Sequence, residues 1–93
     1  MARARTLPTH PDGDTGWLRI SGETYHREIR AAGLALIAHV SPRPRPHKDW
    51  TACVTAIGPG GKHLILDALV KEVPAGEELC EAALVTARRE LQI

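Results

Sequence analysis

The sequence predicts a single small α+β domain, with a three-stranded antiparallel meander that carries two helices on one face. Three apolar segments of strand length follow one another between proline or glycine boundaries. The segments before and after them have apolar residues at helical spacing. The predicted order is β-α-β-β-β-α over residues 16–93, with a short N-terminal strand, Gly16–Ile20, as the fourth strand. Residues 1–15 lack apolar periodicity and are predicted to be a flexible tail.

The meander is predicted from the alternation of side chains across its strands. The three segments are residues 34–40 (LALIAHV), 50–57 (WTACVTAI) and 63–70 (HLILDALV). Side chains alternate between the two faces of a strand, and one face of this meander is entirely apolar. We expect Val40 to pair with Trp50, and Cys53 with Asp67. The apolar face carries Leu34, Leu36, Ala38, Val40, Trp50, Ala52, Val54, Ala56, Leu64, Leu66, Ala68 and Val70.

The opposite face, the mixed face, combines polar groups with large apolar side chains. Its predicted members include Ile37, His39, Cys53, Ile65 and Asp67. Isoleucines on a wetted face favour self-association, because a second copy can cover them. The sequence therefore predicts a homodimer, in which a charge at Ile37 or Ile65 would produce a monomer.

The C-terminal segment predicts a helix over the apolar face. Proline suits a first helical turn, and acidic and basic residues stand where the helix dipole favours them. A narrow apolar stripe at spacings of four, three and four would face the sheet. These residues are Pro74, then Glu77 and Glu78, then Arg88 and Arg89, with the stripe formed by Cys80, Leu84, Ala87 and Leu91.

Residues 21–33 are predicted to form the first helix. Ser21 can cap it, Gly33 can end it, and Tyr25, Ile29 and Ala32 share one helical face. The alternative is a hairpin in which Ser21 and Gly22 form the turn and residues 23–29 a strand. With the helix, the α-β-β-β-α order resembles the topology of double-stranded-RNA-binding domains. Such domains place lysines at the start of the last helix, where this sequence has Glu77, Glu78 and Glu81.

Composition excludes several classes of function. The net charge of +1 gives no global field for nucleic acid. No run of about 18 apolar residues is present, so no transmembrane span is expected. Cys53 and Cys80 lack CxxC spacing, which favours free thiols in a cytoplasmic protein.

No motif predicts a metal, a cofactor or an enzyme. The histidines and cysteines lack ligand spacing, and "GPGG", residues 58–61, lacks the pattern of a phosphate loop. The one triad-like grouping combines Cys53 with Asp67 and His39, without an evident oxyanion hole. A non-enzymatic protein is therefore predicted, with a small enzyme using Cys53 as an alternative.

The most distinctive segment is the basic loop, Ser41–Asp49, within "SPRPRPHKDW". Its alternating prolines predict a stiff, extended rod close to polyproline II. Arginine pairs well with carboxylates and phosphates, so a protein with an acidic surface or a nucleoprotein complex is the expected partner. The candidate partner-binding residues are Arg43, Arg45, His47 and Lys48 in the loop, with Ile37, His39 and Ile65 on the mixed face.

The predicted function is accordingly that of a small protein-binding module. In size and lack of motifs the chain resembles accessory proteins of phages and mobile elements, some of which inhibit CRISPR complexes. That resemblance implies an inhibitor or accessory role. The alternative is a nucleic-acid-binding module that uses the basic loop together with Arg3 and Arg5.

Overall fold

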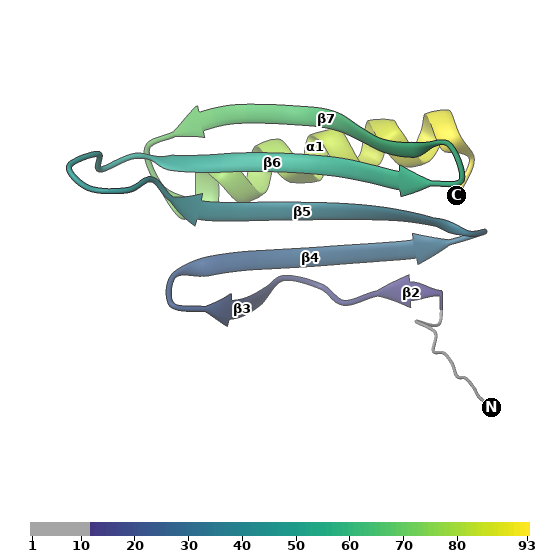
Figure 1. The fold of residues 1–93 in the computed structure, drawn as a ribbon, viewed down its shortest axis with the longest axis horizontal. Helices are drawn as coiled ribbons and strands as arrows, with labels where there is room; N and C mark the ends of the chain where they lie inside the picture. The colour runs from purple at the N-terminus through teal and green to yellow at the C-terminus, as the bar shows by residue number, and fades with distance from the viewer. Residues whose placement is uncertain (1–11) are drawn as a thin grey trace.

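The computed structural model describes residues 12–93, which form one antiparallel sheet with one helix at its back (Figure 1). The sheet has six described strands in the order β2-β4-β5-β6-β7, and β3 pairs with β4 as β2 does. The elements are β2 (Gly13–Asp14), β3 (Leu18–Ser21), β4 (Thr24–Ala31), β5 (Leu34–Pro42), β6 (Trp50–Gly58), β7 (Gly61–Val70) and α1 (Val73–Leu91). Most of the predicted tail lies outside the described residues, while Gly13–Asp14 belongs to the sheet.

The prediction of three strands and two helices is wrong, because residues 21–33 form no helix. Ser21 pairs with Thr24 across a turn, and β4 then runs beside β5 along its whole length. The segment is therefore the hairpin that the sequence offered as its alternative. Without a first helix the α-β-β-β-α order is lost, so the resemblance to double-stranded-RNA-binding domains does not hold.

The signals in this segment fit a strand as well as a helix. Tyr25 and Ile29 are four residues apart, a spacing that places two side chains on one side in either structure. In β4 they point toward α1, with Ile29 only 3% exposed. Gly33, predicted to end a helix, has φ 78° and instead forms a tight turn with Ala32, whose φ is 53°. Two consecutive positive φ values are typical of a turn between paired strands.

The meander of β5, β6 and β7 is confirmed, and so are the faces of β5 and β6. Val40 lies opposite Ala52, and Pro42 lies opposite Trp50. The pairing of β5 with β6 is therefore displaced by two residues from the predicted one. A displacement of two residues leaves every side chain on its predicted face, because the strand repeat is also two.

The pairing of β6 with β7 follows the prediction only in part. Cys53 lies opposite Asp67, as expected. Ile65 is then an extra residue of β7, a β-bulge, so that Leu64 lies opposite Thr55. Leu64 is consequently moved from the apolar face to the mixed face, where it is 62% exposed.

The core lies between α1 and the apolar face of the sheet. Its buried members from the strands are Ile29, Leu36, Ala38, Val40, Ala52, Val54 and Val70, and those from the helix are Cys80, Leu84 and Ala87. Gly76 is also buried, and a Cβ at this position would lie 2.9 Å from Cγ1 of Val40. The helix can approach the sheet closely because this residue has no side chain. The mixed face is the one that α1 leaves uncovered.

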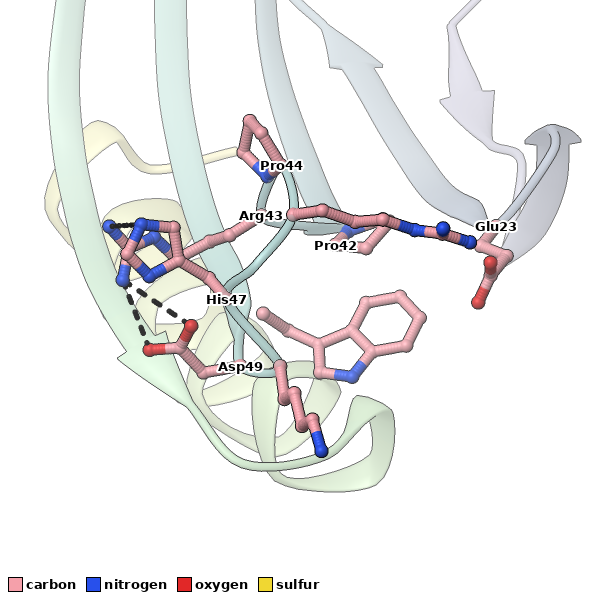
Figure 2. A pocket seen from close by; sticks show the side chains of 9 residues that line it. Glu23, Pro42, Arg43, Pro44, His47 and Asp49 are labelled. Atoms are coloured by element: carbon pink, nitrogen blue, oxygen red, sulfur yellow. Dashed lines mark hydrogen bonds and ion pairs between the residues drawn. The ribbon is translucent and has the colours of Figure 1, made fainter.

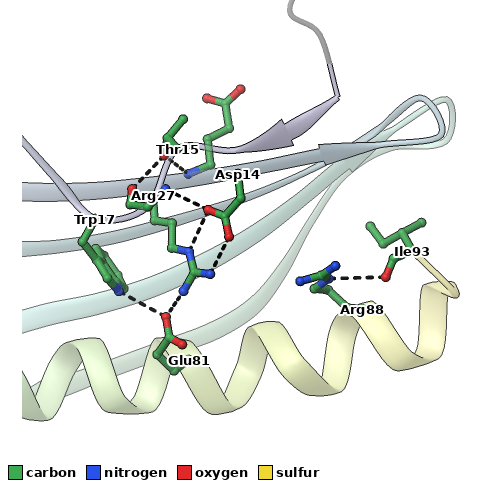
Figure 3. A network of polar contacts seen from close by, with 9 residues as sticks. Asp14, Thr15, Trp17, Arg27, Glu81, Arg88 and Ile93 are labelled. Atoms are coloured by element: carbon green, nitrogen blue, oxygen red, sulfur yellow. Dashed lines mark hydrogen bonds and ion pairs between the residues drawn. The ribbon is translucent and has the colours of Figure 1, made fainter.

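An ion-pair network ties the N-terminal strand and the helix to β4 (Figure 3). Arg27 Nη2 donates to Asp14 Oδ2 at 2.6 Å, and its other terminal nitrogen pairs with Glu81 of α1. Trp17 Nε1 donates to the same glutamate at 3.2 Å. The hydrogen bond from Arg27 holds the pKa of Asp14 below its ordinary value. Arg27 thus points toward the helix without leaving a buried charge unpaired.

Within residues 12–93, no helix is long and apolar enough to cross a membrane.

Candidate functional site

The basic loop folds back on itself, so the prediction of an extended polyproline rod is wrong. Ser41 and Pro42 continue β5, and the backbone N–H of Arg43 donates to the Asp49 carbonyl at 3.2 Å. The N–H of His47 donates to the Pro44 carbonyl at 3.1 Å, which closes a turn at the tip. These backbone hydrogen bonds make the loop a closed structure rather than a projecting arm.

Arg43 fastens the two sides of this loop (Figure 2). Its Nη1 lies 3.3 Å from both carboxylate oxygens of Asp49, and its Nη2 lies 3.5 Å from Nε2 of His47. The guanidinium can only donate, so the histidine nitrogen accepts, which requires a neutral ring. Arg43 and His47 therefore contribute to the shape of the loop, and part of their binding capacity is already used within it.

Arg45 and Lys48 differ from Arg43 because both are exposed and, within residues 12–93, neither takes part in an ion pair. An exposed cation without a partner keeps its full capacity to bind an anion. These two side chains are therefore the best placed of the predicted loop residues to contact a partner.

The loop encloses a pocket of about 480 Å³, the loop pocket. Its lining combines prolines and an indole with three cations and two carboxylates: Pro42, Pro44, Trp50, Arg43, Arg45, Lys48, Glu23 and Asp49, together with His47. Trp50, one of the lining residues, is half-buried and also packs against the core. Apolar walls beside free cations fit a side chain or chain end that carries a carboxylate on an aliphatic stem.

The mixed face carries a row of reactive side chains across four strands. His26, His39, Cys53 and Asp67 lie opposite one another in turn on β4, β5, β6 and β7. Nε2 of His39 lies 2.8 Å from Nδ1 of His26, whose other ring nitrogen lies 3.5 Å from Glu28. Burial lowers the pKa of His39, and the neighbouring His26 lowers it further, because both disfavour a positive charge on the His39 ring.

This row does not make the nucleophilic grouping that the sequence suggested. His39 is the direct neighbour of Cys53, yet its ring is hydrogen-bonded to His26. The Cys53 thiol instead contacts the Thr55 hydroxyl at 3.8 Å. A thiol nucleophile needs a base within hydrogen-bond reach, and no base is positioned there among the described residues.

No group of three or more histidine, cysteine, aspartate or glutamate side chains in residues 12–93 is arranged to hold a metal ion. The histidine pair is joined ring to ring, with centroids 4.8 Å apart. Its two facing nitrogens are occupied by each other.

The predicted site residues fall on two separate surfaces. Arg43, Arg45, His47 and Lys48 line the loop pocket, whereas Ile37 and His39 lie on the mixed face and Ile65 lies in the bulge of β7. Sequence reasoning missed Glu23, which reaches the pocket from the turn between β3 and β4. The hairpin alternative for residues 21–29 contained the signal, because only a hairpin brings this turn beside the loop.

No model of a known protein family matches the chain, and neither a curated protein nor a solved structure matches it.

Proposed function

We propose that this chain is a non-enzymatic protein-binding module that holds an acidic segment of its partner in the loop pocket. The observation that carries the proposal is the combination of two unpaired cations, Arg45 and Lys48, with the indole of Trp50 in one pocket. A carboxylate can pair with the cations while its aliphatic stem packs on the indole and the prolines. Such a contact joins charge-assisted hydrogen bonds to apolar burial.

The closed form of the loop supports this proposal energetically. A flexible loop loses conformational entropy when it binds, and that loss weakens the complex. Here the Arg43–Asp49 ion pair and two backbone hydrogen bonds already restrict the loop. The backbone that carries Arg45 and Lys48 is thus already ordered before a partner arrives.

Charge distribution favours a protein partner over nucleic acid. Glu28 and Asp67 accompany the cations of the mixed face, so that face offers no continuous positive track for phosphates. The first half of α1 is acidic and carries Glu77, Glu78 and Glu81. The topology that motivated a nucleic-acid alternative is also absent.

We also propose that the chain is a cytoplasmic protein. Both cysteines are free, and they lie on opposite sides of the sheet, with Cys80 on the inner side of α1 and Cys53 on the mixed face. Free thiols are usual in reducing compartments.

The test is a capture experiment with three proteins, each exposed to cell lysate with and without nuclease treatment. The first is wild type, the second is Arg45→Glu/Lys48→Glu, and the third is the matched control Lys71→Glu/Arg89→Glu. Lys71 and Arg89 are exposed and lie outside the loop pocket, so the control makes the same change in net charge elsewhere. We expect a protein that wild type and the control retain and that the loop variant loses.

Two results would contradict the proposal. Equal loss in both variants would mean that net charge, and not the loop pocket, attracts the partner. Capture that disappears on nuclease treatment would mean that nucleic acid is the ligand, and its binding should then fall steeply with salt.

A further inference from the structure

The two edges of the sheet differ in how they are protected. One edge is built by β2 and β3, strands of two and four residues with an irregular pairing at Arg19–Ser21. Short, broken edge strands are poor templates for another chain. The other edge is β7, a strand of ten residues that pairs only with β6 among the described strands (Figure 1). Its outward backbone groups are available on both sides of the bulge at Ile65.

The bulge in β7 places two opposite charges on the same face. Lys62 and Asp67 are five positions apart, a spacing that would put them on opposite faces of a regular strand. Because Ile65 is an extra residue, Lys62 lies opposite Ile57 and Asp67 lies opposite Cys53, both on the mixed face. Within residues 12–93, neither charge takes part in an ion pair.

Four residues lie between these charges: His63, then the apolar Leu64, Ile65 and Leu66. Leu64 is 62% exposed and Ile65 is 40% exposed. Leu69, just beyond Asp67, is 59% exposed. An unpaired edge with an apolar centre and one charge of each sign at its ends is complementary to itself in the antiparallel direction.

We propose that a second copy of this chain pairs with β7 in the antiparallel direction, about a twofold axis between Leu64 and Ile65. This register sets Lys62 opposite Asp67 of the partner subunit, and Asp67 opposite the partner's Lys62. Both ion pairs lie on one face of a continuous sheet that runs through the two subunits. At the centre Leu64 meets Ile65 of the partner subunit, and Ile65 meets the partner's Leu64, which is the reciprocal arrangement of a twofold interface.

The reciprocal charges favour a second copy over a foreign strand. A foreign strand would need matching charges of its own, whereas the twofold axis supplies both pairs from one sequence. The interface differs from the one predicted from sequence, which joined the mixed faces through Ile37 and Ile65. It also leaves the loop pocket free, because the residues that line this pocket lie outside β7.

The experiment is a charge exchange followed by sedimentation equilibrium at chain concentrations up to about 200 μM, well above a micromolar dissociation constant. Wild type is expected to be a dimer. Lys62→Asp and Asp67→Lys each create two pairs of like charges, and each should weaken association by about tenfold or more. The double variant Lys62→Asp/Asp67→Lys restores both pairs and should again be a dimer.

Two controls separate this interface from other causes. Lys71→Asp makes the same change of charge just outside β7 and should remain dimeric. Ile37→Lys, on the mixed face of β5, should also remain dimeric if circular dichroism shows it folded. A monomeric wild type would overturn the proposal. Single exchanges without effect, a double exchange that fails to restore the dimer, or a dimer lost only with Ile37→Lys would overturn it as well.

Discussion

At the scale of single residues, the two cysteines have contrasting surroundings. Cys80 is fully buried on the side of α1 that faces the sheet, and its thiol lies 3.9 Å from the carbonyl oxygens of His39 and Cys53. Burial raises the pKa of Cys80 to about 11, because the thiolate would lose its hydration. Cys53 is only half-buried and lies on the mixed face.

The reactivity of the two thiols should therefore differ greatly. Only the thiolate attacks a disulfide reagent, and Cys80 has almost none at neutral pH. We expect an aromatic disulfide reagent to label one thiol per native chain at about pH 7.5. Mass spectrometry should assign the label to Cys53, and denaturant should release Cys80. Native labelling of Cys80 at an equal rate would contradict the packing of α1.

His39 makes stability depend on pH. Its pKa is lowered from the ordinary 6.5 by burial and by His26, so the folded state disfavours the protonated ring. Glu28 contacts His26 of this pair and is itself paired with Arg30, whereas Asp67 lies two strands away from His39, opposite Cys53. With a lowered folded-state pKa, the stabilisation is fully present above pH 6.5 and is lost as the pH falls through the folded value.

Thermal unfolding should therefore show a falling Tm as the pH decreases from 6.5. Asp14 has a lowered pKa as well, but its contribution is lost only below its ordinary value of 3.8, which separates the two effects. His39→Gln removes the titrating ring and should flatten the Tm profile between these values. An equally steep profile in that variant would assign the dependence to another group.

At the scale of elements, α1 depends on one glycine for its position. A Cβ on Gly76 would lie 2.9 Å from Val40 and 3.2 Å from Val70, closer than packed carbon atoms normally approach. Alanine is the better helix former by about 1 kcal/mol at an ordinary helical position. Overpacking usually costs about 1–3 kcal/mol, so the clash should outweigh the gain in propensity.

We expect Gly76→Ala to lower the free energy of unfolding by about 1–2 kcal/mol, measured by urea denaturation. The control is Ala82→Gly at an exposed position of the same helix, which should cost about 1 kcal/mol through propensity alone. A Gly76→Ala protein more stable than wild type would show that α1 can move away from the sheet without loss.

Elements differed in how well the sequence predicted them. The meander was predicted from strict alternation of apolar side chains, and α1 from an apolar stripe at helical spacing. Both patterns are strong because the sheet and the helix pack against each other through these side chains. Residues 21–33 were assigned to the wrong structure because Tyr25 and Ile29 fit both periods, and pairing with β5 decided between them. The bulge at Ile65 could not be predicted, since nothing in the local sequence marks an extra residue in a strand of β-formers.

The candidate site was predicted in composition but not in shape. Its cations were read from the sequence, whereas the backbone and side-chain hydrogen bonds of Arg43 decide that the loop is closed. The contribution of Glu23 depends on the β3–β4 turn, and therefore on the element that was assigned wrongly. Glu23 is distant from the basic loop in the sequence, and only the folded sheet brings the β3–β4 turn beside this loop.

At the scale of the whole molecule, one helix covers one face of the sheet and leaves three surfaces for other molecules. These are the loop pocket at one end of the strands, the mixed face, and the edge of β7. Of these three surfaces in residues 12–93, the loop pocket is the one with a cavity, which Arg45, Lys48 and the indole of Trp50 line. We therefore expect the loop pocket to bind a carboxylate-bearing segment of a protein.

The most direct measurement is a titration of the full chain with a fluorescein-labelled, glutamate-rich peptide, followed by anisotropy. We expect saturable binding of the peptide to wild type, and an affinity lower by about tenfold or more in Arg45→Glu/Lys48→Glu. In Lys71→Glu/Arg89→Glu, which carries the same net charge, the predicted change is less than about threefold. Equal affinities for the peptide in all three proteins, or equal losses in the two variants, would contradict the claim that the loop pocket is the binding site.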